Sequence, residues 1–159
     1  RGYFPSLVER GETFLGYVYE GYWIDIGTPE KYTQVHQDIM DGRFGAGPFA
    51  RAGASRVLVS PTAQVDAAAI INGPCFIGDG VRIAAGAEVG PHAVIGSGSQ
   101  VAASALIERS ILWPGCHVDS HAEVRGALVG RDCRIGAHAV VSSGAVLGDE
   151  TVLTDYTKT

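Results

Sequence analysis

The chain has 159 residues and a formal net charge of -5, a length that suits one domain or a domain with part of another. Its only lysines are Lys31 and Lys158, and no basic stripe is visible, so we expect no nucleic-acid partner. No apolar run approaches the roughly 20 residues that span a bilayer, and no signal peptide is visible, so we expect no membrane partner.

The three cysteines are an odd number and lack the C-x-x-C spacing of redox and zinc motifs. This pattern favours reduced thiols over a disulfide framework, and it predicts a cytoplasmic location.

The N-terminal residues, "RGYFPSLVERGE", have the pattern of a helix end closed by Gly11. Since the chain starts at Arg1 rather than at a methionine, we expect it to be the C-terminal part of a longer protein. The next stretch, "FLGYVYEGYWIDIG", is rich in aromatic and β-branched side chains. It predicts two short strands joined near Glu20 and Gly21.

A helix is expected next, with Thr28 as its N-cap, Pro29 at its first position and Glu30 in its first turn. Apolar residues that recur at helical spacing would face a core: Tyr32, Val35 and Ile39. Gly42 would end this helix. Residues 43–56 hold three glycines and a proline, and they predict a linker.

A repeat of six residues occupies the rest of the chain. Its aliphatic positions are Val59, Val65, Ile71, Ile77, Ile83, Val89, Ile95, Val101 and Ile107, then Leu112, Val118 and Val124, then Val129, Ile135, Val141, Leu147 and Leu153. A mostly small residue follows four positions later, as in Ala63, Ala69, Cys75, Val81, Ala87, Ala93, Ser99, Ala105 and Ile111. The register slips by one residue at Ile107–Leu112 and again at Val124–Val129.

A period of six fits neither an α-helix nor an alternating strand, but it fits a short strand and a tight corner. Three such units make a triangular coil of about 18 residues, with the aliphatic and small residues inside. Glycines near the corners, such as Gly78 and Gly80, tolerate the backbone angles that a corner requires. The two slips lie one coil apart on the same face. Between five and six coils would form a prism roughly 27 Å long.

This pattern resembles the left-handed parallel β-helix of hexapeptide-repeat proteins, and the hand comes only from that resemblance. The stretch "GYWIDIGTP", Gly21 to Pro29, is similar to the last motif of the catalytic domain in sugar nucleotidyltransferases. These enzymes join a nucleoside triphosphate to a sugar 1-phosphate and release pyrophosphate, and many bacterial members carry such a prism after this motif. "GYWIDIGTPEKY" and "SILWPGCHV" look most like bacterial mannose-1-phosphate guanylyltransferases.

The resemblance covers the whole chain and implies its organisation. Residues 1–42 would be the strand-helix remnant that ends an α/β nucleotidyltransferase domain, 43–56 the linker and 57–159 the left-handed β-helix domain. The expected fold is therefore mainly β, and the prism would serve oligomerisation and regulation. The implied partners are a nucleoside triphosphate, a sugar 1-phosphate (GTP and mannose 1-phosphate being our choice) and further copies of the chain.

The resemblance also implies site residues. The aspartate of the motif is a ligand of the catalytic Mg²⁺ in the family, and it corresponds to Asp25. Trp23 and Gly27 would form a substrate pocket wall and let the backbone approach the sugar phosphate. The family's glycine-rich loop, second metal aspartate and phosphate-binding lysine precede this motif, and this chain contains none of them. We therefore assign no complete catalytic set to the chain and expect it to be inactive by itself.

Other residues leave alternatives open. The cysteines, Cys75, Cys116 and Cys133, all occupy the small inward position and should be inert packing residues. His92, His121 and His138 share a position near a corner, where they would be solvated, form a stacked pair or weak metal site, or supply a catalytic base. Trp113 and Pro114 would mark a protruding contact, or Trp113 would cover a prism end.

Two rival functions remain. A trimeric acyltransferase that uses acetyl-coenzyme A explains the prism but leaves Gly21–Pro29 unexplained. The non-enzymatic hypothesis is that the chain serves only as a scaffold.

Overall fold

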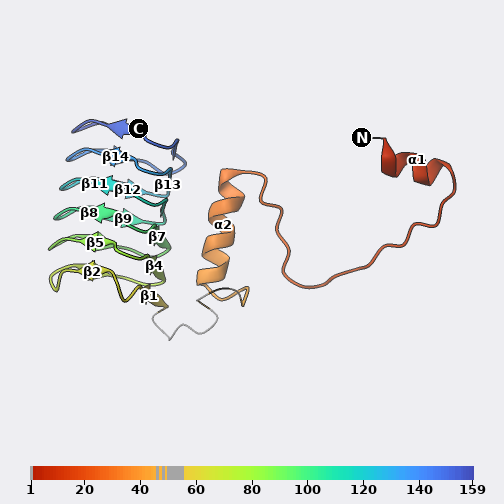
Figure 1. Cartoon of the computed structure of the whole chain (residues 1–159), viewed down its shortest axis with the longest axis horizontal. Coiled ribbons are helices and arrows are strands. Elements are labelled where there is room, and N and C mark those ends of the chain that lie inside the picture. The colour runs from red at the N-terminus through yellow and green to blue at the C-terminus, as the bar shows by residue number, and fades with distance from the viewer. Residues whose placement is uncertain (1, 46, 48, 50–55) are drawn as a thin grey trace.

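The structure is a computed structural model that describes residues 2–45, 47, 49 and 56–159. Its helices are α1 (Tyr3–Glu9) and α2 (Pro29–Met40) (Figure 1). Its strands are β1 (Val57–Val59), β2 (Gln64–Val65), β3 (Ile70–Ile71), β4 (Cys75–Ile77), β5 (Arg82–Ile83), β6 (Glu88–Val89), β7 (Ala93–Ile95), β8 (Gln100–Val101), β9 (Leu106–Glu108), β10 (Ile111–Leu112), β11 (His117–Val118), β12 (Glu123–Arg125), β13 (Leu128–Val129), β14 (Arg134–Ile135), β15 (Val140–Val141), β16 (Val146–Leu147) and β17 (Val152–Leu153).

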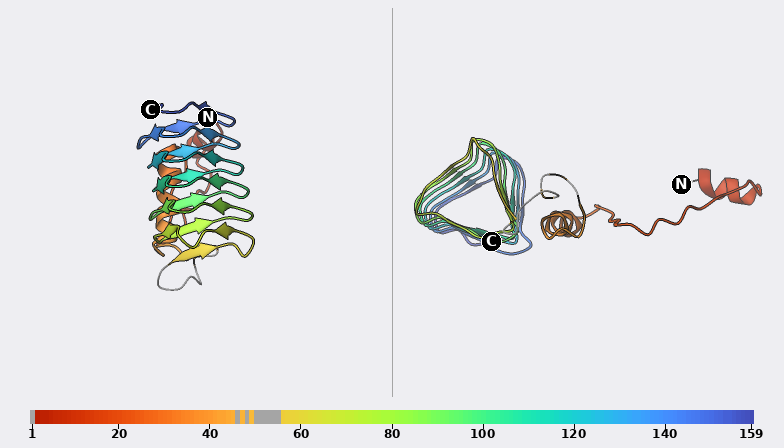
Figure 2. Two further views of the ribbon diagram at one scale, coloured as in Figure 1. Left: turned by 90° about the vertical axis from the view of Figure 1, so that its left-hand side faces the viewer. Right: turned by 90° about the horizontal axis from the view of Figure 1, so that it is seen from below.

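The strands form a left-handed parallel β-helix with a triangular outline, which confirms the expected fold class (Figure 2). Every third strand belongs to the same face. Sheet A contains β1, β4, β7, β10, β13 and β16; sheet B contains β2, β5, β8, β11, β14 and β17; sheet C contains β3, β6, β9, β12 and β15. Each face is therefore a parallel sheet whose strands belong to successive coils.

The strand register confirms the hexad pattern. In sheet A the aliphatic position pairs Val59 with Ile77, Ile77 with Ile95, and Ile95 with Leu112. The first two steps span 18 residues and the third spans 17, as the predicted slip requires. The second slip gives the same shortened step from Leu112 to Val129. Both slips lie at the corner that leads from sheet C into sheet A.

The inward side chains form one continuous core. Ile77, Ile95, Ile107 and Ile135 are fully buried, because each is covered by the coils above and below it. Val59 belongs to the first described coil and is 43% exposed, since β1 is an edge strand among the described residues. Burial thus depends on stacking, and the inner coils carry most of the hydrophobic stabilisation.

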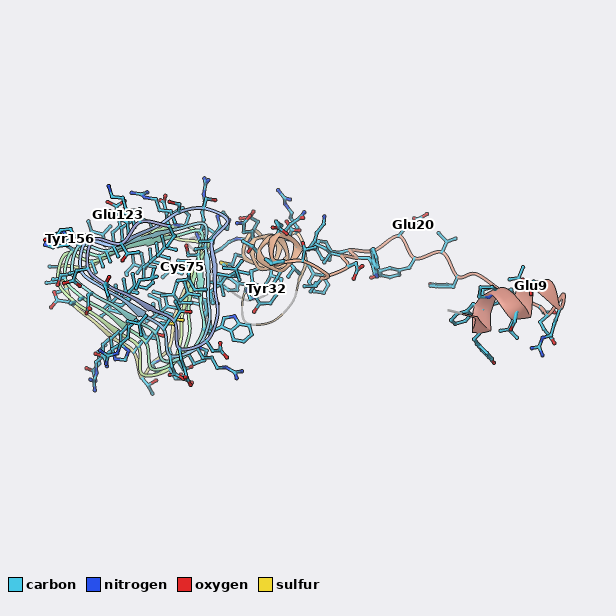
Figure 3. The ribbon with its side chains drawn as sticks, turned by 90° about the horizontal axis from the view of Figure 1, so that it is seen from above. Glu9, Glu20, Tyr32, Cys75, Glu123 and Tyr156 are labelled. Atoms are coloured by element: carbon cyan, nitrogen blue, oxygen red, sulfur yellow. The ribbon has the colours of Figure 1, made fainter. Side chains whose placement is uncertain are left out.

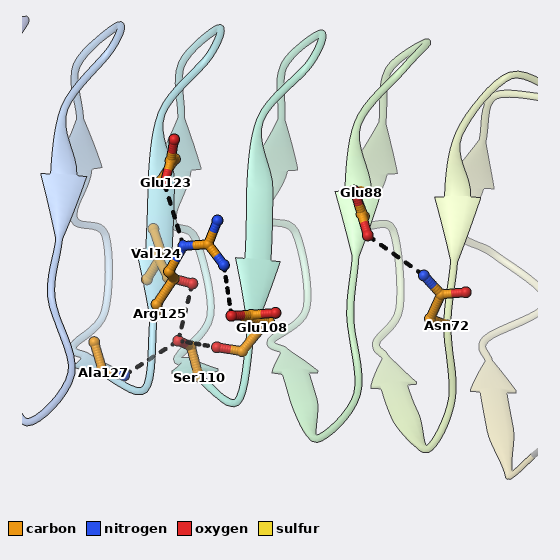
Figure 4. Close-up of polar contacts among 8 residues, drawn as sticks. All are labelled: Asn72, Glu88, Glu108, Ser110, Glu123, Val124, Arg125 and Ala127. Carbon is orange, nitrogen blue, oxygen red and sulfur yellow. Dashed lines mark hydrogen bonds and ion pairs between the residues drawn. The ribbon is translucent and has the colours of Figure 1, made fainter.

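One inward position was predicted wrongly. The pattern places Ile111 inside, four residues after Ile107, but the slip shortens this corner and turns Ser110 inward instead. The Ser110 hydroxyl accepts a hydrogen bond from Ala127 N, and the carbonyls of Glu108 and Val124 lie within reach of its own proton (Figure 4). A buried hydroxyl thus joins two coils where the backbone is one residue short.

The three cysteines fill the prism interior as expected, and none forms a disulfide. Figure 3 shows Cys75 among the inward side chains, whereas Glu123 and Tyr156 lie outside. Burial raises the pKa of the Cys75 and Cys116 thiols to about 11, and it also raises the pKa of Cys133. These thiols hold their protons near neutral pH, which fits inert packing residues.

The outer surface of sheet A is apolar, unlike those of the other two sheets. The residue before each inward position forms its outer row: Leu58, Phe76, Val94, Ile111, Leu128 and Val146. Helix α2 lies along this row with its axis parallel to the prism (Figures 1 and 2). Ile111 is consequently only 3% exposed although it points out of the prism. The predicted core-facing residues of α2, Tyr32, Val35 and Ile39, are partly buried.

The helix ends follow the sequence signals. The Thr28 hydroxyl accepts a hydrogen bond from Lys31 N, as expected for an N-cap. Gly11 and Gly42 adopt φ angles of +67° and +76° just after α1 and α2. Glycine reaches this left-handed conformation without strain, so both helices end where the sequence predicts.

The two strands expected in residues 14–27 do not form, since the structure assigns no strand to this described stretch. The segment runs from α1 to α2 without folding back at Glu20 and Gly21 (Figure 1). A strand needs a hydrogen-bonded neighbour, and no described strand lies beside this segment. Side chains such as Leu15, Tyr17 and Val18 are therefore more than 80% exposed.

The predicted linker, 43–56, lies partly outside the described residues, which omit 46, 48 and 50–55. The last residue of the linker, Arg56, is attached to α2, because its Nη1 donates to Met40 O at 2.8 Å. In the described ranges, neither helix has the length and apolar character needed to cross a bilayer.

We predict that Gly130→Ala destabilises the prism whereas Gly148→Ala does not. The two glycines occupy the same corner position on adjacent coils. A Cβ at Gly130 would lie 2.6 Å from Asp149 N, a backbone atom that cannot move aside, but a Cβ at Gly148 would meet nothing within 4 Å. Overpacking should cost about 1–3 kcal/mol at Gly130, against about 0.5 kcal/mol or less at Gly148. Urea unfolding followed by circular dichroism measures both, and equal losses would contradict the stacking geometry.

We also predict that the native thiols react slowly with a disulfide reagent at pH 8. A thiol with a pKa of about 11 is roughly 0.1% thiolate at that pH. Labelling should follow unfolding in denaturant, when all three cysteines become available, with glutathione as the free-thiol control. Because the folded pKa values are raised, the stability linked to these thiols is present below pH 8.5 and is lost as the pH rises through about 11. Rapid labelling of the folded chain would show that the interior opens.

Candidate functional site

The Gly21–Pro29 motif is fixed to α2 through Tyr22. The Tyr22 hydroxyl donates to Asp38 Oδ2 at 2.7 Å, and Arg43 Nη1 donates to Asp38 Oδ1 at 3.0 Å. The Tyr22 ring also stacks on Phe44, with 5.1 Å between centroids. The hydrogen bond to the Asp38 carboxylate raises the pKa of Tyr22, so the bond persists until strongly alkaline pH. Asp38 is thus a buried acid that binds the segment before α2 through Tyr22 and the segment after α2 through Arg43.

The predicted site residues do not form a complete site within the described residues. Asp25 is exposed, and Trp23 is 77% exposed on the chain that leads away from α2. No group of three or more histidine, cysteine, aspartate or glutamate side chains in this part of the chain has the geometry of a metal site. Asp25 supplies one carboxylate, and Mg²⁺ needs further oxygen ligands that hold it against water. The described residues alone therefore do not fit a magnesium centre.

Gly27 lies at a pocket of about 400 Å³ between the Gly-Thr-Pro turn, α2 and the prism. Its walls are mainly apolar and include Ile26, Tyr32, Trp113, Leu128, Val146 and Asp149. Trp113 lies beside α2, with its ring 6.5 Å from the Tyr32 ring and the Arg131 guanidinium 5.2 Å above it. It therefore protrudes from a corner toward the helix and does not cover a prism end. The pocket lies where the motif meets three coils of the prism, those of Trp113, Leu128 and Val146.

His121 and His138 stack on adjacent coils, with ring centroids 4.9 Å apart and planes 2° from parallel. Tyr156 extends the stack by a further 4.9 Å. A metal ion must lie close to the plane of each ligating imidazole, so one ion cannot satisfy two parallel rings at this separation. Of the alternatives, the geometry favours a stacked aromatic ladder over a shared metal site.

His92 is not simply a solvated corner residue. Its Nε2 lies 2.7 Å from Asp41 Oδ1, at the C-cap of α2. Together with the bond from Arg56 to Met40 O, this contact fixes the C-terminal end of α2 to the first coils. The orientation of the motif relative to the prism thus depends on polar contacts at one end of α2 and on apolar packing along its length.

Sequence reasoning missed Asp38, Arg43 and Asp41, which hold this arrangement. Asp38 is 5% exposed and lies three residues after Val35, on the same side of the helix. An acid on the apolar side of a helix is a usable signal of a buried polar contact. Its partner Tyr22 lies 16 residues away, and no local spacing identifies such a pair.

Comparison with known proteins gives consistent results. The model of the GMPPB C-terminal domain family matches residues 71–158. The mannose-1-phosphate guanylyltransferase of Mycobacterium tuberculosis is 34% identical over 110 residues, which cover 69% of this chain and 30% of that protein. The glucose-1-phosphate adenylyltransferase of Bacillus cytotoxicus is 24% identical over 151 residues, which cover 87% of this chain and 36% of that protein. The chain thus spans about a third of the length of these curated relatives.

A solved structure shares the architecture. The acetyltransferase domain of PglB from Neisseria gonorrhoeae aligns with a TM-score of 0.51 and 21% identity, and the alignment covers 80% of this chain and 58% of that one. At this identity the likeness shows the fold alone, and the shared feature is the prism. The family match covers more than half of the chain and lies within the prism, whose register the structure confirms. This chain therefore belongs to the GMPPB C-terminal domain family.

Proposed function

We propose that this chain is the C-terminal part of a sugar-1-phosphate nucleotidyltransferase, which transfers a nucleotidyl group from a nucleoside triphosphate to a sugar 1-phosphate. The observation that carries the proposal is the Gly21–Pro29 motif, attached through Tyr22 and α2 to a prism of this family. In this proposal residues 1–42 end the catalytic domain and residues 57–159 form the β-helix domain. An acyltransferase does not explain the motif.

For the substrates we propose GTP and mannose 1-phosphate. The family match and the mycobacterial guanylyltransferase support this choice. Adenylyltransferases that act on glucose 1-phosphate also align with the chain, at lower identity. Assays of the intact enzyme with each pair of substrates distinguish the two.

The exposed apolar side chains before α2 support a larger catalytic domain. Tyr3, Phe14, Tyr17, Tyr19 and Trp23 are each between 57% and 90% exposed. Such a concentration of exposed aromatic surface marks a segment that packs against another surface. We propose that this surface is the remainder of the catalytic domain, where residues 14–27 would gain the strand partners that they lack here.

Asp25 is proposed as one ligand of a Mg²⁺ ion that the rest of the catalytic domain would complete. A divalent cation there would neutralise charge on the phosphate oxygens of the reactants. The chain's own contribution is positional. Tyr22 holds the backbone three residues before Asp25, and the Thr28 cap starts a rigid helix three residues after it. The carboxylate is thereby held between two fixed points and faces solvent.

For the prism we propose a role in assembly of the enzyme and in regulation, in the cytoplasm. Two of its three faces have no covering element within the described residues, and flat parallel sheets suit self-association.

We predict that Asp25→Asn in the intact enzyme lowers kcat by about 100-fold or more, because a neutral amide is a poor Mg²⁺ ligand. Glu20→Gln removes an exposed acid from the same segment and is the matched control, which should retain activity. Pyrophosphate release measured over a range of Mg²⁺ concentrations reports the change. Equal activity of the two variants would contradict the proposal that Asp25 is a metal ligand.

The 159-residue chain alone should form no sugar nucleotide with GTP and mannose 1-phosphate. Binding of acetyl-coenzyme A, measured by calorimetry on the same sample, should also be absent. Detectable nucleotide-sugar synthesis by this chain would contradict the assignment of the missing residues to the rest of the protein, and acetyl-coenzyme A binding would favour the acyltransferase.

A further inference from the structure

The three faces of the prism differ in how their outward side chains are satisfied. Sheet A is covered by α2. On sheet C, Arg125 bridges Glu108 at 2.6 Å and Glu123 at 3.2 Å, so its charge is paired within the chain (Figure 4). On sheet B, Arg82 and Arg134 are exposed, and neither forms an ion pair with any residue that the structure describes. Sheet B is therefore the face whose strand arginines have no acidic partner among the described residues.

Two parallel rows of outward residues line sheet B. The outer row precedes the inward position and is mostly long: Gln64, Arg82, Gln100, His117, Arg134 and Val152. The second row follows the inward position and is small or acidic: Asp66, Ala84, Ala102, Asp119, Gly136 and Thr154. A groove of about 470 Å³ follows the two rows over four coils. The face thus presents a ridge of long side chains beside a channel with small and acidic residues.

We propose that sheet B is a self-association surface on which two copies pack with parallel prism axes about a two-fold axis. This symmetry places the outer row of one copy against the second row of the other at the same coil. Arg82 and Gln100 then lie over the partner's Ala84 and the partner's Ala102, which leave room for them. His117 faces the partner's Asp119, and Arg82 lies one coil from the partner's Asp66.

The opposite arrangement is unfavourable. Antiparallel prisms would place each outer row against itself in reverse order. Arg82 would then face the partner's Arg134, and Gln100 would face the partner's His117. Like charges directly opposite each other are destabilising, and long side chains would meet long side chains with no channel to enter. The charge pattern therefore selects the parallel pair.

The size of the face limits the affinity. Sheet B has six strands spaced about 4.8 Å apart, and one face of the prism is about six residues wide. These dimensions give a face of roughly 500 Å² per copy. The total of about 1,000 Å² is at the lower bound for a specific interface, so we expect a weak, reversible dimer. Its ion pairs should make it weaker at high salt.

The test is sedimentation equilibrium of the full-length protein without substrates. Arg82→Glu removes the attraction to the partner's Asp66, and Ala102→Arg fills the channel, so each should raise the dissociation constant about tenfold or more. The double variant Arg82→Glu with Asp66→Arg should recover affinity, because it exchanges the two charges. Ser142→Arg places the same side chain at the matching hexad position of sheet C and is the control, which should associate like the unmodified protein. Circular dichroism confirms that each variant is folded.

Three outcomes would overturn the proposal. Tighter association of Arg82→Glu would indicate the antiparallel pair. Equal weakening by Ser142→Arg would place the contact on sheet C. Unchanged mass in every variant would exclude sheet B as an interface. Since mass is measured without nucleotide or sugar phosphate, none of these results bears on whether the protein transfers nucleotidyl groups.

Discussion

The stacking of one coil on the next is the constraint on which the rest of the structure depends. No coil can bury its aliphatic residues alone, because each inward side chain is covered by equivalents one coil above and below. The backbone must therefore return to the same lateral position after three strands. A missing residue at one corner is tolerated only when the adjacent coil accommodates it. The two slips occur at the same corner, and Ser110 supplies there the hydrogen bonds that join the shortened turns.

The same stacking creates the surface on which α2 rests. Successive coils align their outward residues into rows, so an apolar residue repeated once per coil becomes a hydrophobic strip along the prism. In sheet A the helix α2 lies along this strip (Figure 1), and His92 and Arg56 fix the helix end with polar contacts. The helix carries Asp38, which holds Tyr22 of the motif. A chain of contacts thus leads from the prism core to the segment that bears Asp25, and its stiffness depends on the prism being folded.

Much of the prism could be predicted because its information is local and repeated. The hexad fixed the strand positions, the pairing register and both slips, and it placed all three cysteines inside. It failed at Ile111, since a shortened corner changes which residue turns inward. The expected strands in residues 14–27 failed for a different reason, because strand propensity has no effect without a neighbouring strand. The docking of α2 was also missed, although the row from Phe76 through Ile111 to Leu128 could have revealed it once every third hexad was compared.

The site was less predictable than the fold because its contacts join distant residues. Asp38 and Tyr22, or His92 and Asp41, are brought together only by the packing of α2 on sheet A. The residue before each inward position also varies without disturbing the core, since it points away from the prism. It is apolar on sheet A, a mixture of aliphatic and acidic side chains on sheet C, and mostly long and polar on sheet B. A uniform interior therefore allows three different exteriors, and the function of such a domain has to be sought in its outward rows, one face at a time.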